Sequence, residues 1–368
     1  MPSIKTPDFK LNIGGIDFTS NKKLREMVNE IEVDMVSDGA SSFVVRLDDR
    51  DGGFAGGTSG RKIVEGMSCT IELGFEGSGA GKGTAKLIEG IVTGVKTERK
   101  EYQRTVFTVT GFDGLQALTR GRKRRAWEQV KDSCLASQIA NENGLQPDVE
   151  DSGIIHPYVV QNNENDLSFL FERAKRIGFE VKVEEKRLVF KKPKRTEDLP
   201  ITLSWKGEDE NPGSVYLLQR CDFNTSTMNV VKKVVVRSYD PKTAKEIIGT
   251  AESIEGGSMG GEKDAGEYAA SNNPDTTIQI SDQPVTCAEE AEALAKSILN
   301  ERAGNYMTGR GRCEGCNKMK CGKKVTIKEV GSQYEGDYYI TSAKHSFKVG
   351  HSHGFGYWTD FTVSRTGH

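Results

Sequence analysis

The chain has 368 residues, and its 51 Lys and Arg side chains nearly balance its 53 Asp and Glu side chains, for a formal net charge of -2. This length predicts two to four modules with real cores, and the balanced charge excludes a general attraction to nucleic acid or to anionic membranes. No apolar run approaches the roughly 18 residues of a membrane-spanning helix. The seven cysteines are an odd number, and the first residues carry no apolar signal segment. These features predict reduced thiols and a protein made in the cytoplasm.

Strand patterns dominate the first 120 residues. Apolar and polar residues alternate in FKLNIGGIDFT, EIEVDMVSDGASSFVVRLDD, SCTIELGFEG, AKLIEGIVTGVKTER and RTVFTVTGFD, and Gly or Asp turns separate these segments. Glycine-rich loops are expected at 52–60 and 74–83. We predict that residues 1–120 form a first tube-like antiparallel β-barrel.

The pattern changes to a mixture of helix and strand after Arg120. Ser133 can cap a short helix that stops at Gly144, and Asn165 or Asp166 can cap a second helix that runs to Ile177. The second helix is expected to be core-forming, because its apolar residues lie on one face. A hairpin, FEVKVEE and RLVFKKP, follows. Residues 121–199 are predicted to be a small α/β insert.

Strand patterns return over residues 200–368. A helix over 286–303, with Thr286 and Glu289 as a capping box, is expected to pack on them. Residues 254–276 are expected to form a flexible loop, since Gly256 to Asn273 are small, polar and glycine-rich. The predicted fold class is α+β and mainly β, with two tube-like antiparallel β-barrel domains flanking the α/β insert.

Residues for catalysis are not apparent in the sequence. The five histidines occur in no HExxH motif, and no GxSxG or Walker sequence is present. The run GSGAGKG suggests a phosphate-binding loop, but Lys82 is followed by Gly83 and not by Ser or Thr. A hairpin loop is the favoured interpretation, and no catalytic residue is predicted.

One dense basic run contains Arg120, Arg122, Lys123, Arg124 and Arg125. These side chains could bind phosphate groups. Alternatively, they form a solvated linker or pair with acidic groups of a neighbouring subunit. Only one aromatic residue, Trp127, lies nearby, so a stacking platform for nucleic acid is not supported. No specific nucleic-acid partner is predicted.

Three cysteines, Cys313, Cys316 and Cys321, lie within nine residues. If GKKVTIKEV and YYITSAKHSF form a hairpin, His345 is expected opposite Lys323, close to Cys321. Three thiolates and one imidazole could then form a structural zinc site, and the thiolates could instead hold an iron–sulfur cluster. The alternative is three reduced thiols without a metal, with His345 packed on the sheet.

Several stretches resemble the late control protein D family, the baseplate hub proteins of contractile phage tails, pyocins and injection systems. They also resemble the hub half of type VI secretion spike proteins. The matches run in the family's order through most of the chain. They are LIEGIVTGVKTER with FTVTGFDGLQALTRGRKRRAW, YVVQNNENDLSFLFERAKRIGFEVKVEEKRLVFKKP, EEAEALAKSILNERAGNYMTGRGR, GKKVTIKEVGSQYEGDYYITSAKHSFKVG and GYWTDFTVSR.

This resemblance implies a structural, non-enzymatic hub, assembled in the bacterial cytoplasm as part of the baseplate. The implied assembly is a homotrimeric ring that adapts a sixfold inner tube to a threefold spike. Its implied partners are a trimeric spike protein, the initiator ring of the inner tube and a tape-measure or LysM-type adaptor protein. The chain stops soon after the second barrel, so the spike is expected to be a separate polypeptide. The cysteine triplet falls where the family pattern has a polar turn.

Two other functions compete with the hub. One is a tail-associated cell-wall hydrolase, which would need a further domain bearing catalytic carboxylates. The other is a cytosolic module that binds metal or nucleic acid through the cysteine triplet or the basic run.

Overall fold

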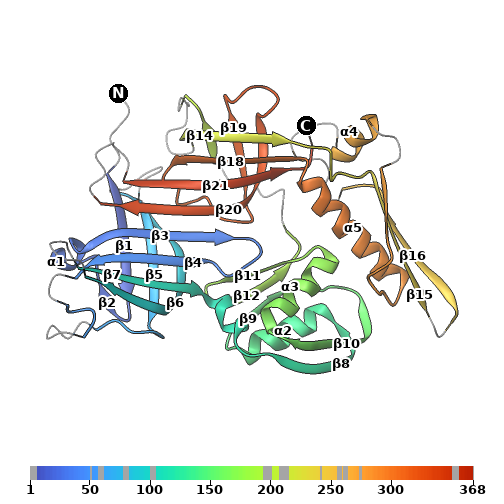
Figure 1. The fold of residues 1–368 in the computed structure, drawn as a ribbon, viewed down its shortest axis with the longest axis horizontal. Helices are drawn as coiled ribbons and strands as arrows, with labels where there is room; N and C mark the ends of the chain where they lie inside the picture. Colours follow the sequence, from blue (N-terminus) through green and yellow to red (C-terminus); the bar gives the residue numbers. More distant parts are fainter. Residues whose placement is uncertain are drawn as a thin grey trace.

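A computed structural model describes residues 6–49, 52–56, 62–77, 83–99, 105–193, 201–206, 215–240, 243–254, 259, 264–272, 276–349 and 356–367. The fold is mainly β, with 52% strand and 18% helix, and it includes a closed six-stranded barrel with extra strands. The predicted fold class, α+β and mainly β, is thus confirmed. In Figure 1 the two β-rich units lie together, with the small insert below them and a long helix with its neighbouring strands to one side.

The N-terminal lobe, residues 6–113, is a strongly curved antiparallel sheet in the order β3-β4-β7-β6-β5-β1-β2. Among its described residues no pairing of β1 with β3 closes this sheet into a barrel. Asn21 caps a one-turn helix whose Leu24 side chain is buried in the lobe. The elements are β1 (Pro7–Ile13), β2 (Ile16–Asp17), α1 (Lys22–Arg25), β3 (Val28–Val36), β4 (Ser42–Asp48), β5 (Ser68–Phe75), β6 (Gly83–Glu98) and β7 (Val106–Asp113).

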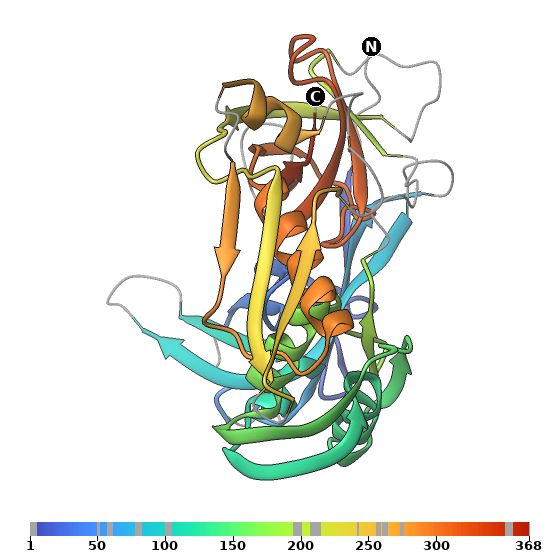
Figure 2. The ribbon, with the colours of Figure 1, turned by 90° about the vertical axis from the view of Figure 1, so that its right-hand side faces the viewer.

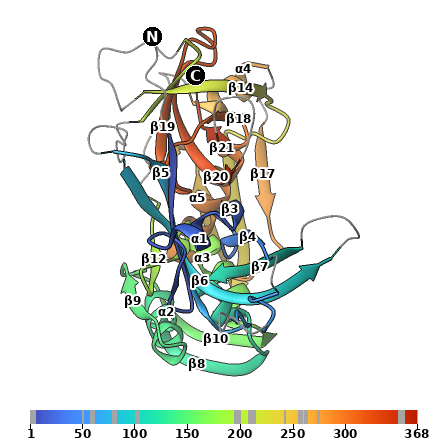
Figure 3. The ribbon, with the colours of Figure 1, turned by 90° about the vertical axis from the view of Figure 1, so that its left-hand side faces the viewer.

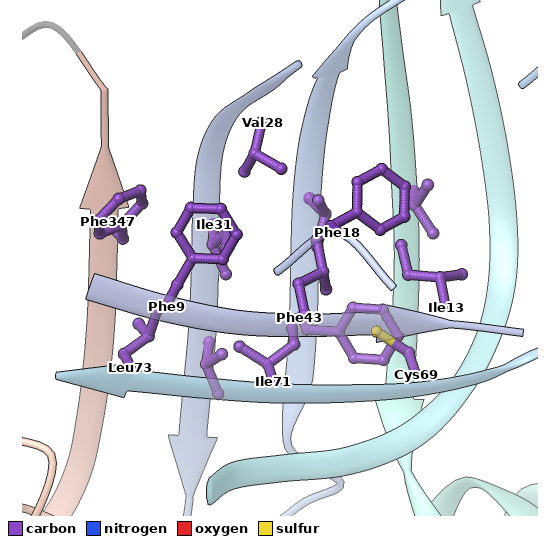
Figure 4. Packing of buried hydrophobic residues seen from close by; sticks show 14 of the residues in the cluster. Phe9, Ile13, Phe18, Val28, Ile31, Phe43, Cys69, Ile71, Leu73 and Phe347 are labelled. Carbon is purple, nitrogen blue, oxygen red and sulfur yellow. The ribbon is translucent and has the colours of Figure 1, made fainter. Parts of the chain in front are cut away.

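Strand alternation builds the core of this lobe. In β1, Phe9, Leu11 and Ile13 point inward while the residues between them face outward, as a period of two requires. They pack against the inward side chains of the other strands (Figure 4). Phe347, from a strand far along the sequence, joins this core with its ring centroid 5.1 Å from that of Phe9.

The insert has its own core between two helices and two small sheets. Its outer sheet is the two-stranded ribbon of β8 and β10, and its inner sheet has the order β11-β12-β9. Leu115 and Leu118, from a short 3-10 helix, belong to this core. The elements are η1 (Gly114–Thr119), β8 (Lys123–Lys131), α2 (Asp132–Glu142), β9 (Gln146–Val149), β10 (Ile155–Glu164), α3 (Asp166–Ile177), β11 (Glu180–Glu184) and β12 (Arg187–Lys191).

The C-terminal barrel closes on itself. Its strands follow the order β19-β13-β14-β18-β21-β20, and a pairing of β19 with β20 completes the ring. Tyr216, Tyr338 and Phe361 are among the buried residues of its core. The strands are β13 (Thr202–Ser204), β14 (Val215–Thr225), β18 (Met307–Glu314), β19 (Lys324–Lys328), β20 (Gly336–Lys348) and β21 (Tyr357–Arg365).

The helix expected over 286–303 is α5 (Ala288–Gly304), but it packs mainly on a separate sheet. Together with β15 (Lys233–Asp240), β16 (Lys245–Ala251) and β17 (Thr277–Ile280), α5 forms an arm with its own core. Figure 2 shows these strands lying along the helix. Gly249 is needed there, since a Cβ atom at this position would lie 2.2 Å from the Ala291 carbonyl carbon. The capping pair also differs, because Glu290 and not Glu289 accepts the Thr286 amide hydrogen.

The predicted loop at 254–276 requires a correction. Residues Ala265–Asn272 form helix α4, and its Ala265 and Ala269 side chains are buried in the core of the C-terminal barrel. Packing of these two side chains against the barrel thus stabilises the helix, although the segment as a whole is small and polar. Most of residues 255–263, and 273–275, lie outside the described part, as does most of the 77–83 run.

The described residues form four hydrophobic cores, in the N-terminal lobe, the insert, the arm and the C-terminal barrel. The sequence predicts three domains, 1–120, 121–199 and 200–368. The third of these ranges holds two of the cores, and Leu115 and Leu118 lie in the core of the insert although they precede residue 121. The boundaries at 120 and 199 stay predictions.

Candidate functional site: the junction between the lobe and the barrel

Strand β20 belongs to both β-rich units. Its first part, Gly336 to Tyr339, pairs with β19 and closes the C-terminal barrel. Its second part, Ser342 to Lys348, pairs with β3 of the N-terminal lobe. The change of partner coincides with a register shift between Ile340 and Ser342 in the pairing with β21. All the strands of the lobe and of the barrel are therefore joined in one 13-stranded sheet (Figure 3).

Charged pairs cross the outer face of this continuous sheet. Lys344, whose neighbours Ala343 and His345 are buried, points outward and binds Glu32 of β3 at 3.3 Å. On the barrel side, Arg312 binds both carboxylate oxygens of Asp360 at 2.8 and 2.9 Å. The face is thus polar and nearly balanced in charge. Further pairs on it are Arg310–Asp222, Arg46–Glu30 and Lys348–Glu30.

The turn at residues 314–323, which contains two of the predicted metal ligands, Cys316 and Cys321, fixes the barrel to the lobe. The Asn317 side-chain amide donates to the carbonyl oxygens of Leu73 and Gly83, at 3.1 and 3.2 Å. The Lys320 ammonium group donates to the Lys86 carbonyl oxygen at 3.0 Å. These bonds tie a loop of the barrel to strands β5 and β6 of the lobe.

His345 lies beneath this turn and is fully buried. Its Nε2 donates to the Met319 carbonyl oxygen at 2.9 Å, so its Nδ1 accepts from the Tyr357 hydroxyl at 3.0 Å. Burial lowers the pKa of His345 to about 4, so the ring is neutral at pH 7. The expected placement opposite Lys323 is wrong, because Ile340 lies there, and His345 pairs with Val33 and Thr359. The register of the β19–β20 pairing, in which Lys324 lies opposite Tyr339, causes this difference.

The cysteine thiols are held by other contacts. The Cys321 thiol donates to the Thr341 carbonyl oxygen at 2.9 Å, and the Cys313 thiol lies 3.7 Å from the Thr359 carbonyl oxygen. Burial raises the pKa of Cys316 to about 11 and that of Cys321 to about 12. Metal binding requires the thiolate forms that this burial disfavours.

The described residues contain no group of three or more His, Cys, Asp or Glu side chains arranged to hold a metal ion. Both ring nitrogens of His345 are also engaged elsewhere. The arrangement of Cys313, Cys316, Cys321 and His345 therefore does not fit a zinc or iron–sulfur centre. The metal centre stays a prediction without support from the geometry, and elemental analysis of untagged protein tests it.

A buried ionic cluster between the insert and the arm is not evident from the sequence. Asp132 accepts two hydrogen bonds from the Arg173 guanidinium, at 2.5 and 3.1 Å, and lies 3.0 Å from His156 Nε2. Burial would raise the pKa of Asp132, but the bonds from His156 and Arg173 outweigh it and hold the pKa below its usual range. Arg176 binds Glu290 of α5 at 3.0 Å. The cluster thus braces the insert against the arm, and only the tertiary fold assembles it.

The side chains of the basic run lie in two different environments, one ion-paired and one exposed. Lys123 and Arg125 bind Asp166, whose side chain is only 2% exposed, at 2.6 and 2.8 Å. Burial would raise the pKa of Asp166, but these partners and neighbouring amides keep it below its usual range. The side chains of Arg120, Arg122 and Arg124 are exposed. The run is therefore partly a structural anchor, and it is not a continuous phosphate-binding patch.

Helices of the described chain are all too short or too polar to cross a membrane.

Comparisons with known proteins agree with this fold. The family described as Alg8 N-terminal domain matches residues 5–348. A curated relative, a probable baseplate hub protein of Escherichia phage P2, is 27% identical over 192 residues, which are 52% of this chain and 46% of the relative. The chain spans about half the length of the curated relatives it matches.

Solved structures share the fold over nearly the whole chain. The 43 kDa tail protein of prophage MuSo2 from Shewanella oneidensis has a TM-score of 0.68 and 14% identity, with 97% of this chain and 98% of that chain covered. An E. coli component of the type VI secretion system has a TM-score of 0.54 and 12% identity, with 96% and 76% covered. The family match shows that the chain belongs to the Alg8 N-terminal domain family, and the curated relatives and solved structures to which it is similar are baseplate hub, phage tail and type VI secretion proteins.

Proposed function

We propose that the protein is the structural hub of a baseplate, in which three copies form a ring between the inner tube and the spike. The observation that carries this proposal is the single 13-stranded sheet that unites the N-terminal lobe and the C-terminal barrel through β20. Three copies with two curved units each give six similar units around one axis, which suits a sixfold tube on one side and a threefold spike on the other.

The polar outer face of the sheet supports a wall around a wet passage. Its charges are paired across neighbouring strands, as in Lys344–Glu32 and Arg312–Asp360, so the face needs no apolar cover. The hydrogen-bonded turn at 314–323 holds the lobe and barrel at a fixed angle. A rigid connection of this kind suits a ring that must transmit force between tube and spike.

The role we propose is structural and not catalytic. The buried His345 and the Asp132–His156 pair bond to groups of the protein itself, and both serve to hold elements together. The proposed partners are a trimeric spike protein, the initiator ring of the inner tube and a tape-measure or LysM-type adaptor protein. Assembly would take place in the bacterial cytoplasm before the particle is released. Neither the hydrolase nor the metal or nucleic-acid module gains support from the relatives.

Light scattering tests the ring directly. We expect a mass three times that of one chain for the isolated protein, or a mass of three chains plus the spike protein after the spike is added. Imaging of the assembled particle should then place the chain at the junction of tube and spike. A mass of one chain in the presence of spike, with the fold intact by circular dichroism, would rule out the trimeric hub.

A further inference from the structure

The ribbon of β8 and β10 presents one face to the insert core and the other to solvent. Residues that alternate along β8 separate the basic run, so that Lys123 and Arg125 point inward to Asp166. Arg124 points outward, opposite Asn162 of β10. The inward ion pairs fix the ribbon on the insert, and this holds Arg124, which lies between Lys123 and Arg125, toward solvent.

The outward face of the ribbon is apolar at its centre. Val160, paired with Ala126, is 43% exposed, and Tyr158, paired with Glu128, is 57% exposed. Ile155, at the start of β10, is 54% exposed. Large apolar side chains this exposed, gathered on one strand next to arginines, match the composition of protein interfaces, which are enriched in Tyr and Arg.

The outward arginines have no partner in the described part of the chain. The side chains of Arg120, Arg122 and Arg124 form neither an ion pair nor a hydrogen bond there, whereas Lys123 and Arg125 are both neutralised. The described ribbon also has only two strands, so β8 and β10 each keep one edge without a strand partner. Such edges can accept a further strand by backbone hydrogen bonding.

We propose that this outer ribbon face, made of Arg122, Arg124, Ala126, Glu128, Tyr158 and Val160, docks an acidic, extended segment of another protein. Carboxylates of the segment would pair with the unpartnered arginines, and its apolar residues would cover Val160 and Tyr158. A protein segment suits the face better than a nucleic acid, because apolar side chains of a protein can cover Val160 and Tyr158 and a phosphate backbone cannot. The ribbon is separate from the 13-stranded sheet, so this proposal does not depend on the trimeric ring that we propose for the protein.

A binding experiment with the full chain tests the proposal. The probe is a fluorescein-labelled peptide of about ten residues, the length of a long strand, in which glutamate alternates with valine. We expect saturable binding by fluorescence anisotropy that weakens as salt is raised. Arg122→Glu with Arg124→Glu should raise Kd at least about tenfold, and Val160→Ser should also weaken binding.

Matched variants control for charge and exposure. Lys22→Glu with Lys23→Glu gives the same change of charge on exposed residues of the N-terminal lobe, and Ile248→Ser alters an arm residue that is also 43% exposed. Both should bind the peptide like the wild type. The proposal is overturned if the peptide does not bind, or if the control pair weakens binding as much as the arginine pair. Tighter binding of single-stranded oligothymidylate, insensitive to Val160→Ser, would assign the face to nucleic acid. A fall in mass of the Arg122→Glu, Arg124→Glu variant by light scattering would assign it to another copy of this chain.

Discussion

At the scale of single residues, the junction depends on side chains whose neutral forms fit their surroundings. His345 donates from Nε2 and accepts at Nδ1, and this pattern fails if both nitrogens carry hydrogen. Burial raises the pKa values of Cys316 and Cys321, so both thiols stay protonated. A buried histidine and three cysteines close in sequence are also what a metal site requires. Composition and spacing therefore cannot separate a metal site from a set of unliganded buried side chains, and the hydrogen bonds of His345 favour the unliganded arrangement.

His345 should make the protein less stable in mild acid. Its pKa is about 4 in the folded chain and about 6.5 when exposed, so below pH 6.5 the unfolded state takes up a proton that the folded state does not. The contribution of neutral His345 to the free energy of unfolding is fully present above the exposed pKa of about 6.5, and it falls as the pH drops toward the folded pKa of about 4. At pH 5 this group should cost about 2 kcal/mol relative to pH 8, at about 1.4 kcal/mol per pH unit.

Denaturant unfolding of the wild type and of His345→Gln at both pH values measures this effect. The glutamine amide can still donate to the Met319 carbonyl oxygen but does not titrate. The wild type should lose about 2 kcal/mol more than the variant between pH 8 and pH 5. Equal losses in the two proteins would show that His345 is not the titrating group.

At the scale of elements, helix α3 shows how one segment serves both packing and docking. Asn165 caps it through the Ser168 amide, and Gly178 ends it with φ 68°, a left-handed conformation that favours glycine. Leu167, Leu170 and Ala174 face the core of the insert. Arg173 and Arg176 leave the same helix toward Asp132 and toward Glu290 of the arm. The helix thus fixes the position of the arm relative to the insert.

Leu170→Ala should destabilise the protein strongly. The side chain is fully buried among the apolar residues of the insert, so its truncation leaves a cavity and should cost about 2–5 kcal/mol. Glu172→Ala is the control, since this residue is exposed on the same helix, and it should change stability by less than about 0.5 kcal/mol. Thermal unfolding compares the two. If Leu170→Ala is as stable as Glu172→Ala, the helix is not core-forming.

Acid should also release the insert from its ion pairs. The pKa values of Asp132, Asp166 and Glu290 are all held low, although burial opposes this in each case. Because the pKa values of these carboxyl groups are lower in the folded chain than in the unfolded chain, the groups stabilise the fold above the exposed pKa of about 4. This contribution disappears as the pH falls through the pKa values of the folded chain. Hydrogen exchange should therefore show α2 and α3 losing protection below about pH 4 in the wild type. Asp166→Asn should already show reduced protection at pH 7, and unchanged exchange there would contradict the role of this cluster.

At the scale of the whole molecule, the N-terminal lobe and the C-terminal barrel are not independent bodies. They share β20, and Phe347 and Tyr357 from the C-terminal strands lie in the core of the lobe. Gly315 is packed so tightly that a Cβ atom there would lie 2.0 Å from the Tyr357 ring. A load applied to one unit is therefore passed to the other through backbone hydrogen bonds and not through a flexible linker.

The lobe and the barrel should consequently unfold together. Phe347→Ala removes a buried ring from the core of the lobe, and we expect a loss of about 3–5 kcal/mol that lowers hydrogen-exchange protection in β3 and also in β18 and β21. Leu299→Ala, in the core of the arm, is the control and should leave β3 protected. Opening of β3 while β18 and β21 stay fully protected would show two separate folding units.

The sequence by itself determined the local structure and the family. The alternation of apolar and polar residues predicts the strands of the lobe and barrel, the capping residues predict α3, and the longer matching stretches indicate the hub resemblance. All three signals depend only on residues that are neighbours along the chain. Only the tertiary structure decided that β20 changes partner, that α5 covers a separate sheet, that α4 forms within a polar stretch and that His345 bonds to Met319. Each of these depends on residues far apart in sequence. The packing of the whole chain decides which strand edges and which faces meet. The periodicity, charge and spacing of residues within one segment do not determine these contacts.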